Sequence, residues 1–253
     1  MKKIDFISIL KAEHYKARGN FAVLLMLLFP LIILLIVDIY IIYESKGSDI
    51  FGYNPWVYIL GRYTFNFFIF LYPMITSILC YSLCEIESKN NNYKQLFTLP
   101  VNKLSLFLAK IIYLTEIILL SVLVAYIFFL GSGYCFSYIL PELAFQDYDA
   151  RDIIFIVFCK IFLSLLAIAS IQYCLSLTFK SFVIPISIGC FITIFTLLVS
   201  SKWDYNYLIP YYSINNASMS FSHEVDIVEM EQYYNSIFYI VFMIIGYFLF
   251  KRK

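Results

Sequence analysis

Residues 21–43, FAVLLMLLFPLIILLIVDIYIIY, form an apolar run long enough to cross a lipid bilayer as a single helix. A hydrocarbon core about 30 Å thick needs roughly 20 apolar residues per helix. Five basic residues precede the run, as in a secretory signal, but the apolar stretch of a signal has only about 7 to 15 residues and ends at a small-residue cleavage site. This run is longer and leads into Ile42-Tyr43-Glu44, so it is expected to remain in the membrane.

The same signal recurs along the 253 residues, of which 62% are hydrophobic, 20% aromatic and only 14% charged, with a mean hydropathy of +0.83. This composition excludes an ordinary soluble domain. A transmembrane β-barrel would instead show segments of about 10 residues with alternating polarity. The sequence therefore predicts an all-α integral membrane protein, a single domain over residues 1–253. Its six transmembrane helices are expected at Phe21–Tyr43, Phe65–Cys84, Leu104–Leu130, Ile153–Phe179, Phe182–Ser200 and Tyr233–Phe250.

Lysine and arginine residues are distributed unevenly between the two sides of this predicted bundle. Thirteen lie on the side of the N-terminus and four on the other side, and Lys160 lies within a helix. Cytoplasmic segments of membrane proteins carry the excess of Lys and Arg. Both termini and the loop after the second helix are therefore predicted in the cytoplasm, and residues 201–232 outside.

Residues 1–19 are predicted to contain an amphipathic helix on the cytoplasmic membrane surface. Ile4, Ile7 and Leu10 recur at helical spacing and form its apolar side, whereas Glu13 and His14 are polar. The outer segment, residues 201–232, divides into an aromatic half and an acidic half. Residues 205–212 are expected to be buried over the outer end of the bundle, because so many rings favour an interface, and residues 222–231 are expected to stay in water.

Two of the predicted helices carry small or polar residues every three or four positions, a spacing that gathers them on one helix face. Such a face is either a packing seam between helices or the lining of a transport pathway, and both interpretations remain open. The candidate pathway residues are Asn66, Phe70, Ser77 and Tyr81 in the second helix and Gly189, Thr193 and Thr196 in the fifth.

Two charged residues, Glu116 and Lys160, are expected inside the membrane. Counted along their helices at about 1.5 Å per residue, they lie at comparable depth, so they are candidates for an ion pair. Such a pair would lock helix packing or serve gating or proton transfer, and the absence of any contact is the third possibility.

Motifs for catalysis are missing from the sequence. It has no GxxxxGK[ST] phosphate loop, no GxSxG and no HExxH, and its six cysteines include no CxxC pair. No catalytic residue, metal site, disulfide or nucleic-acid partner is therefore expected.

The polar stretch NNNYKQLFTLPVNK, residues 90–103, stands out between two apolar runs. Tyr93, Leu96 and Phe97 fall on one helical face, and Pro100 ends the helix after Leu99. A short amphipathic cytoplasmic helix over residues 88–100 is predicted. It would either lie on the lipid surface or dock against a soluble protein.

The longer run EIESKNNNYKQLFTLPVNKLSLFLAK, residues 85–110, resembles the cytoplasmic signature of ABC-2 type transporter permeases. The shared features are an acidic residue after the second helix, a short helix, Leu-Pro, a basic residue and a lysine within the third helix. Chain length and helix count agree, and the form of the short helix is most similar to bacterial lantibiotic-protection and bacitracin-type permeases. The pair Asn91-Asn92 departs from the Gly-Thr pair that many members carry.

The resemblance implies that the short helix is a coupling helix, which sits in a cleft of a separate ATPase subunit. The coupling residues implied are Glu87, Tyr93, Lys94, Leu96, Phe97, Leu99 and Pro100. It also implies two ATPase copies that bind ATP and Mg, a second permease subunit of the same or another chain, surrounding membrane lipid, and a re-entrant segment between the last two helices. The setting would be the bacterial cell membrane.

Three function classes follow. The first is the permease subunit of an ATP-driven transporter that exports or extracts an amphipathic compound, such as an antimicrobial peptide or a lipid-like molecule. The second is an ion-coupled secondary transporter, although no internal repeat is visible. The third is a scaffold or sensor that transports nothing. In all three, this chain itself is not an enzyme.

Overall fold

The computed structural model describes residues 5–44, 54–88, 101–199, 205, 208–219 and 229–252. Every regular element within these ranges is a helix. In chain order they are α1 (Phe6–Lys16), α2 (Phe21–Glu44), α3 (Pro55–Ile59), the π-helical turn η1 (Leu60–Thr64), α4 (Phe65–Ser88), α6 (Lys103–Ile139), the 3-10 turns η3 (Pro141–Leu143) and η4 (Phe145–Asp147), α7 (Arg151–Thr178), α8 (Val183–Val199), α9 (Pro210–Met219) and α10 (Met230–Lys251).

The prediction of a multi-pass helical membrane protein is confirmed. Five stretches are long and apolar enough to cross a bilayer: α2, the continuous run Pro55–Ser88, α6, α7 and α10. The apolar α8 has 17 residues, about 25 Å, and is shorter than a typical span. The count of six spans therefore stays a prediction.

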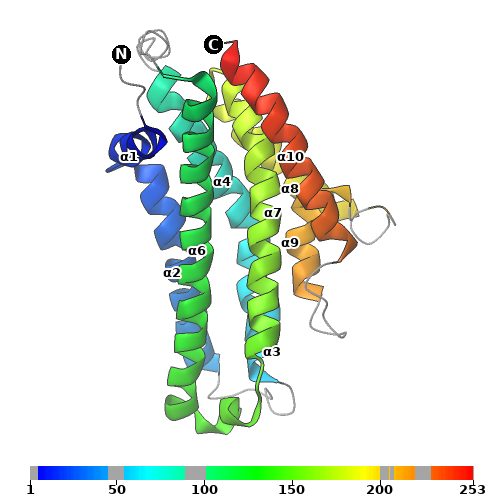
Figure 1. The fold of residues 1–253 in the computed structure, drawn as a ribbon. Helices are drawn as coiled ribbons and strands as arrows, with labels where there is room; N and C mark the ends of the chain where they lie inside the picture. The colour runs from blue at the N-terminus through cyan, green and yellow to red at the C-terminus, as the bar shows by residue number, and fades with distance from the viewer. Residues whose placement is uncertain are drawn as a thin grey trace.

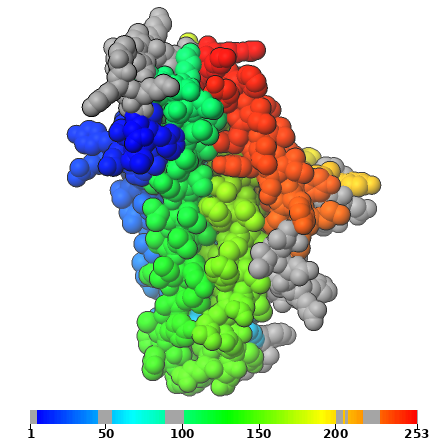
Figure 2. All heavy atoms as spheres, in the orientation of Figure 1, coloured from blue at the N-terminus to red at the C-terminus, as the bar shows by residue number. Residues whose placement is uncertain are grey.

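The long helices run side by side, and both chain ends lie at one end of the bundle, called here the termini end (Figure 1). The opposite end, called the far end, carries α3, η3 and η4. The short α1 lies across the bundle beside α6 rather than along it, and it projects from the flank of α6 in Figure 2. The cytoplasmic location of both termini stays a prediction.

The helix α7 forms the centre of the bundle and packs against α4, α6, α9 and α10. Its fully buried side chains include Ile161, Leu165 and Ile168. By contrast, α2 buries one stripe against α4 and α6 and leaves apolar side chains such as Leu28 and Ile32 exposed. A helix that is apolar all round but buried on one side has lipid as the natural solvent for the other side.

Two predicted helix boundaries differ from the structure by more than one helical turn. The second span begins at Pro55 rather than Phe65, because the Asn54 side chain caps it by accepting a hydrogen bond from the Trp56 N–H, 3.1 Å away, and Pro55 fits the first helical turn. The third continues to Ile139 rather than Leu130, because helical hydrogen bonding extends past the apolar run into Gly131–Ile139.

The first helix packs on a different face from the one predicted. Ile7 is exposed, whereas Ile9 and the polar Glu13 are buried against the bundle; Ile4 lies outside the described residues. Gly19, with φ of 80°, turns the chain sharply between α1 and α2. Asn20 then caps α2 and also accepts a hydrogen bond from Ser82 of α4. Polar partners in the bundle, rather than amphipathic periodicity, select the buried face of α1.

The outer segment contains α9, which packs against α7, α8 and α10. Tyr211 is buried as expected, but Tyr205 is exposed, contrary to the prediction for residues 205–212. Glu231 was expected in water and is instead buried, with its carboxylate accepting a hydrogen bond from Asn216 at 2.6 Å. The re-entrant character of this segment stays a prediction.

Candidate functional site

Four charged side chains meet near the termini end, and we call them the charge cluster: Glu13 and Lys16 of α1, Glu87 of α4 and Lys110 of α6. The Lys110 ammonium lies 3.0 Å from Glu87 Oε1 and 3.4 Å from Glu13 Oε2. The Lys16 ammonium lies 2.6 Å from Glu13 Oε1 and 3.3 Å from Glu87 Oε1. Each cation therefore bridges both carboxylates, and three helices are joined through four charges that sum to zero.

Three of the four charge-cluster residues, Glu13, Glu87 and Lys110, are buried. Lys110 and Glu87 are each only 2% exposed, and Lys110 also donates to the Leu83 carbonyl oxygen at 3.3 Å. Burial raises the pKa of Glu13, but the ammonium groups of Lys110 and Lys16 outweigh it and lower the pKa below the ordinary value. The Glu13 carboxylate is thus ionised at neutral pH.

The charge cluster lies next to the predicted coupling segment in the chain. Glu87 is the next-to-last residue of α4, and α6 begins at Lys103, so the cluster ties together the two helices that flank the predicted coupling segment 88–100. Glu87 is the one predicted coupling residue that the structure describes. The others lie outside the described residues: Tyr93, Lys94, Leu96, Phe97, Leu99 and Pro100.

The predicted pair between Glu116 and Lys160 was wrong, because each has a different partner. Glu116 lies 2.9 Å from His14 Nε2 of α1, and Lys160 lies 2.6 Å from Glu229 at the N-cap of α10. Glu116 is about 20 Å along α6 from Lys103, whereas Lys160 is about 27 Å along α7 from Thr178. The contact with His14 puts Glu116 beside α1, the predicted interfacial helix.

Lys160 belongs to a polar region between α7, α9 and α10. It is 1% exposed, whereas the side chain of its partner Glu229 is 37% exposed. Nearby, Ser164 of α7 shares a hydrogen bond with Ser213 of α9, and Asn235 of α10 donates to Ser213 at 2.8 Å. These hydrogen bonds attach α9 to its neighbours through polar groups.

The candidate pathway residues of α8 lie in a packing seam. Gly189, Thr193 and Thr196 are buried, and a Cβ built on Gly189 would lie 2.6 Å from Gln172 Nε2 and 2.8 Å from Ser77 Oγ. A larger residue at this position would have to displace the side chain of Gln172 or Ser77. On α4, Ser77 is buried, Phe70 and Tyr81 are half-buried, and Asn66 is exposed. A role of these residues in transport stays a prediction.

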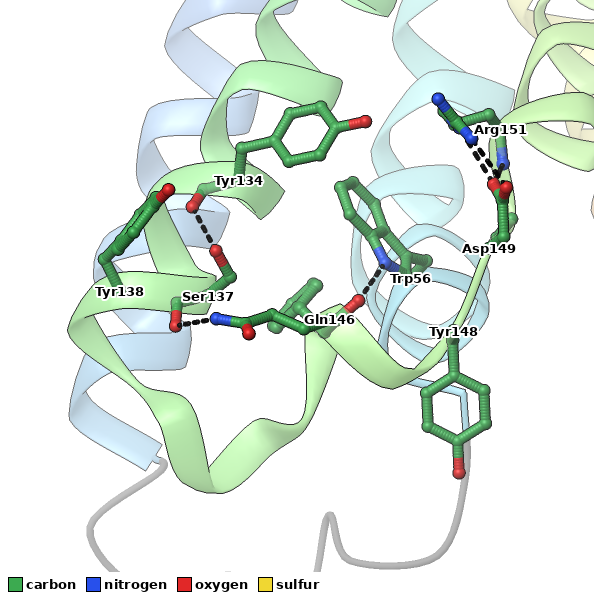
Figure 3. Close-up of a pocket in the computed structure, with 10 residues that line it drawn as sticks. Trp56, Tyr134, Ser137, Tyr138, Gln146, Tyr148, Asp149 and Arg151 are labelled. Atoms are coloured by element: carbon green, nitrogen blue, oxygen red, sulfur yellow. Dashed lines mark hydrogen bonds and ion pairs between the residues drawn. The ribbon is translucent and has the colours of Figure 1, made fainter.

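A groove of about 610 Å³ lies at the far end, between the end of α6, the turn η4 and the start of α7 (Figure 3). Trp56 of α3 forms its inner wall, with the indole N–H donating to the Phe145 carbonyl oxygen at 3.1 Å. The rings of Tyr134 and Tyr138 line the α6 side, and Gln146 Nε2 donates to the Ser137 carbonyl oxygen at 3.1 Å. We call this feature the far-end groove.

Sequence reasoning missed three elements of these sites. Glu13 was placed on the solvated side of α1, and its partners were not identified because they are far apart in sequence. Glu229 was counted only as an outer acidic residue, although Lys160 needed a counter-ion. The far-end groove combines residues from three segments; its one visible signal was the aromatic and acidic character of residues 134–152.

A scan against models of protein families matches residues 9–196 to the family described as ABC-2 family transporter protein. The match covers more than half of the chain and includes all three helices of the charge cluster: α4 and α6 in full and α1 in part. A search of curated proteins found no match, and neither did a search of solved structures.

Proposed function

Because this chain belongs to the ABC-2 transporter family, we propose that it is the membrane-spanning permease subunit of an ATP-driven transporter. In this proposal residues 88–100 form the coupling helix, which docks on a separate ATPase subunit that binds ATP and Mg. Two ATPases and a second permease subunit complete the assembly. The setting is the bacterial cell membrane with both termini in the cytoplasm, and the substrate is an amphipathic peptide or a lipid-like compound.

The charge cluster is the observation that carries this proposal. Glu87 of α4 precedes segment 88–100 in the chain and Lys110 of α6 follows it, and their charged groups lie 3.0 Å apart. Each also pairs with a residue of α1: Lys110 with Glu13, and Glu87 with Lys16. A force applied to this segment by an ATPase would reach α4 and α6 together, because separating the buried charges is costly. The same contacts would carry α1 along.

The alternative of ion-coupled transport has one structural feature in its favour, the buried Lys160 and its half-exposed partner Glu229. An intramembrane charge pair is a reason to consider ion movement. Lys160 nevertheless joins the start of α10 to α7, which is a sufficient structural role. Dependence on an ATPase separates the two functions.

Substitution of Leu96 by Asp tests the coupling helix. A charge on the predicted apolar docking face would be left desolvated and unpaired, so we expect at least a tenfold loss of the ATPase that co-purifies with the tagged wild-type permease. Gln95→Asp is the matched control, because it adds the same charge to the adjacent residue off that face and should retain the ATPase. Equal ATPase recovery with L96D and Q95D, at equal permease yield, would contradict the assigned docking face.

If no ATPase accompanies the wild-type permease in stoichiometric amount, the proposed function itself fails. Transport by the purified permease alone in liposomes with an ion gradient would then favour the secondary transporter. The two experiments give separate answers, because co-purification measures association with an ATPase and the liposome assay measures transport.

A further inference from the structure

The far-end groove has the size and lining of a small-molecule site. Its volume of about 610 Å³ falls within the range of roughly 300 to 1,000 Å³ typical of ligand pockets, which are mostly apolar with a few polar groups. The walls are aromatic, and Gln146 is held in place by its hydrogen bond to the Ser137 carbonyl oxygen (Figure 3). Neither the family match nor the coupling role assigns any function to this groove.

The one basic residue of the groove is already neutralised. Arg151 Nε lies 2.9 Å from Asp149 Oδ1, and Arg151 Nη2 lies 2.7 Å from Asp149 Oδ2, a bidentate pair. Hydrogen bonds from the Arg151 side chain and backbone lower the pKa of Asp149 to about 2, so the carboxylate stays charged in neutral solution. An anionic ligand would have to compete with this carboxylate for the guanidinium.

The remaining charge around the groove is negative. Residues 139–152 carry four carboxylates and one guanidinium, and Glu142, Asp147 and Asp152 are all exposed. These three carboxylates flank the groove in the chain and do not line it. Their negative charge raises the local concentration of cations near the groove.

The groups that line the groove also favour a cation. The ring of Tyr138 is 84% exposed, Tyr134 is 49% exposed, and the faces of aromatic rings attract ammonium and guanidinium groups. Gln146 uses its N–H as a donor to Ser137, which leaves its carbonyl oxygen on the groove as an acceptor. An organic ammonium ion binds to aromatic ring faces and oxygen acceptors. The groove offers both, and its one guanidinium is already paired with Asp149.

We propose that the far-end groove binds organic cations that carry apolar substituents, with the ammonium against Tyr134 and Tyr138 and the outer carboxylates supplying long-range attraction. The inference deepens the proposed function, because under that proposal the groove selects a cationic amphipathic substrate on the side away from the ATPase. Binding itself does not depend on the ATPase, and it is measured on the permease alone.

Trp56 supplies a reporter for the experiment. The chain has two tryptophans, Trp56 and Trp203, so Trp203→Phe leaves the groove residue as the sole tryptophan. The full-length variant, purified in a non-ionic maltoside detergent, is titrated with three probes of the same shape that differ in charge: choline, 3,3-dimethylbutan-1-ol and 3,3-dimethylbutanoate. We expect a saturable change in Trp56 emission with choline at a midpoint at least tenfold lower than with the alcohol, and no saturation with the carboxylate.

Variants of an exposed ring link binding to the groove. In the W203F background, Tyr138→Leu should raise the choline midpoint about two- to fivefold, the effect of removing one cation–π contact, whereas Tyr138→Phe should leave it unchanged. Tyr15→Leu makes the same substitution at an exposed tyrosine of α1, near the termini end, and should also leave the midpoint unchanged. Because Tyr138 is largely exposed, these variants are expected to fold.

Equal midpoints for choline and the alcohol would overturn the proposal, because they would show that the groove recognises the apolar group and not the positive charge. Tighter binding of the carboxylate would overturn it by making Arg151 the recognition group, and no saturable response to choline would also reject it. None of these results alters ATPase co-purification, so failure of the cation site and failure of the permease assignment are distinguishable.

Discussion

Lys110 is the residue on which the termini end depends most. Its ammonium contacts Glu13, Glu87 and the Leu83 carbonyl oxygen, and it is almost completely buried. The cost of moving a charge out of water is offset only while its partners are present. Glu13, Lys16, Glu87 and Lys110 should therefore behave as one unit rather than as independent contacts.

Substitution of Lys110 by Met should lower the free energy of unfolding by about 3–5 kcal/mol, because two carboxylates lose a buried partner. The double variant Glu87→Gln/Lys110→Met should recover part of this loss, since a balanced pair, Glu13 and Lys16, then remains. Thermal unfolding in detergent measures both. Lys11→Met, at an exposed position of α1, is the control and should change stability by no more than about 0.5 kcal/mol. Additive losses in the double variant would show that the four charges act separately.

At the scale of elements, Trp56 fixes α3 to the end of α6. Its ring lies 6.1 Å from Phe129, 5.6 Å from Tyr134 and 5.1 Å from Phe145, measured between centroids. It also packs directly on Gly133, where a Cβ would lie 2.2 Å from the indole. A glycine is thus required in the interior of α6 for close approach, despite its unfavourable helix propensity.

The contrast between two glycines of α6 gives a sharp test of this contact. Gly133→Ala should destabilise the protein by about 1–3 kcal/mol, because the indole must move to make room for the methyl group. Gly131→Ala, two residues away, meets nothing within 4 Å and should be neutral or stabilising by up to about 1 kcal/mol through helix propensity. Thermal unfolding of the two variants checks the prediction. Equal effects would mean that Trp56 does not pack on Gly133.

At the scale of the whole molecule, the structure has two distinct ends. The termini end carries the charge cluster and α1, and the far end carries the groove (Figure 1). α6 has 37 residues, about 55 Å, and therefore exceeds a hydrocarbon core of about 30 Å. Part of this helix must therefore extend beyond the core.

Single cysteines in a background without the six native cysteines should report the orientation of the two ends. We expect Tyr138→Cys to react with a membrane-impermeant thiol reagent in intact cells, because this position is highly exposed at the far end. Tyr15→Cys, 77% exposed in the wild type, should react only after permeabilisation. Labelling of both positions in intact cells, or of Tyr15→Cys alone, would reverse or reject the topology predicted from the lysine and arginine bias.

The sequence by itself determined that the protein is a bundle of long apolar helices, because each run exceeds the thickness of a bilayer and the backbone must satisfy its own hydrogen bonds there. It also indicated the family, through the run that ends at Lys110. Counting residues along two helices did not identify the partners of Glu116 and Lys160, because distance along a helix does not say which side chains face each other.

Only the tertiary structure decided which charges meet. Lys110 joins Glu13 and Glu87 across 97 and 23 residues of sequence, and Lys160 joins Glu229 across 69 residues. Periodicity identifies the faces of one helix, but it does not say how a neighbouring helix is rotated or shifted against it. A buried Lys110 ammonium without counter-ions would cost more free energy than an exposed Ile7 side chain. Glu13 therefore faces inward, where it pairs with Lys110, and Ile7 faces outward. The far-end groove likewise exists because three chain segments converge, and local sequence encodes each segment but not their meeting.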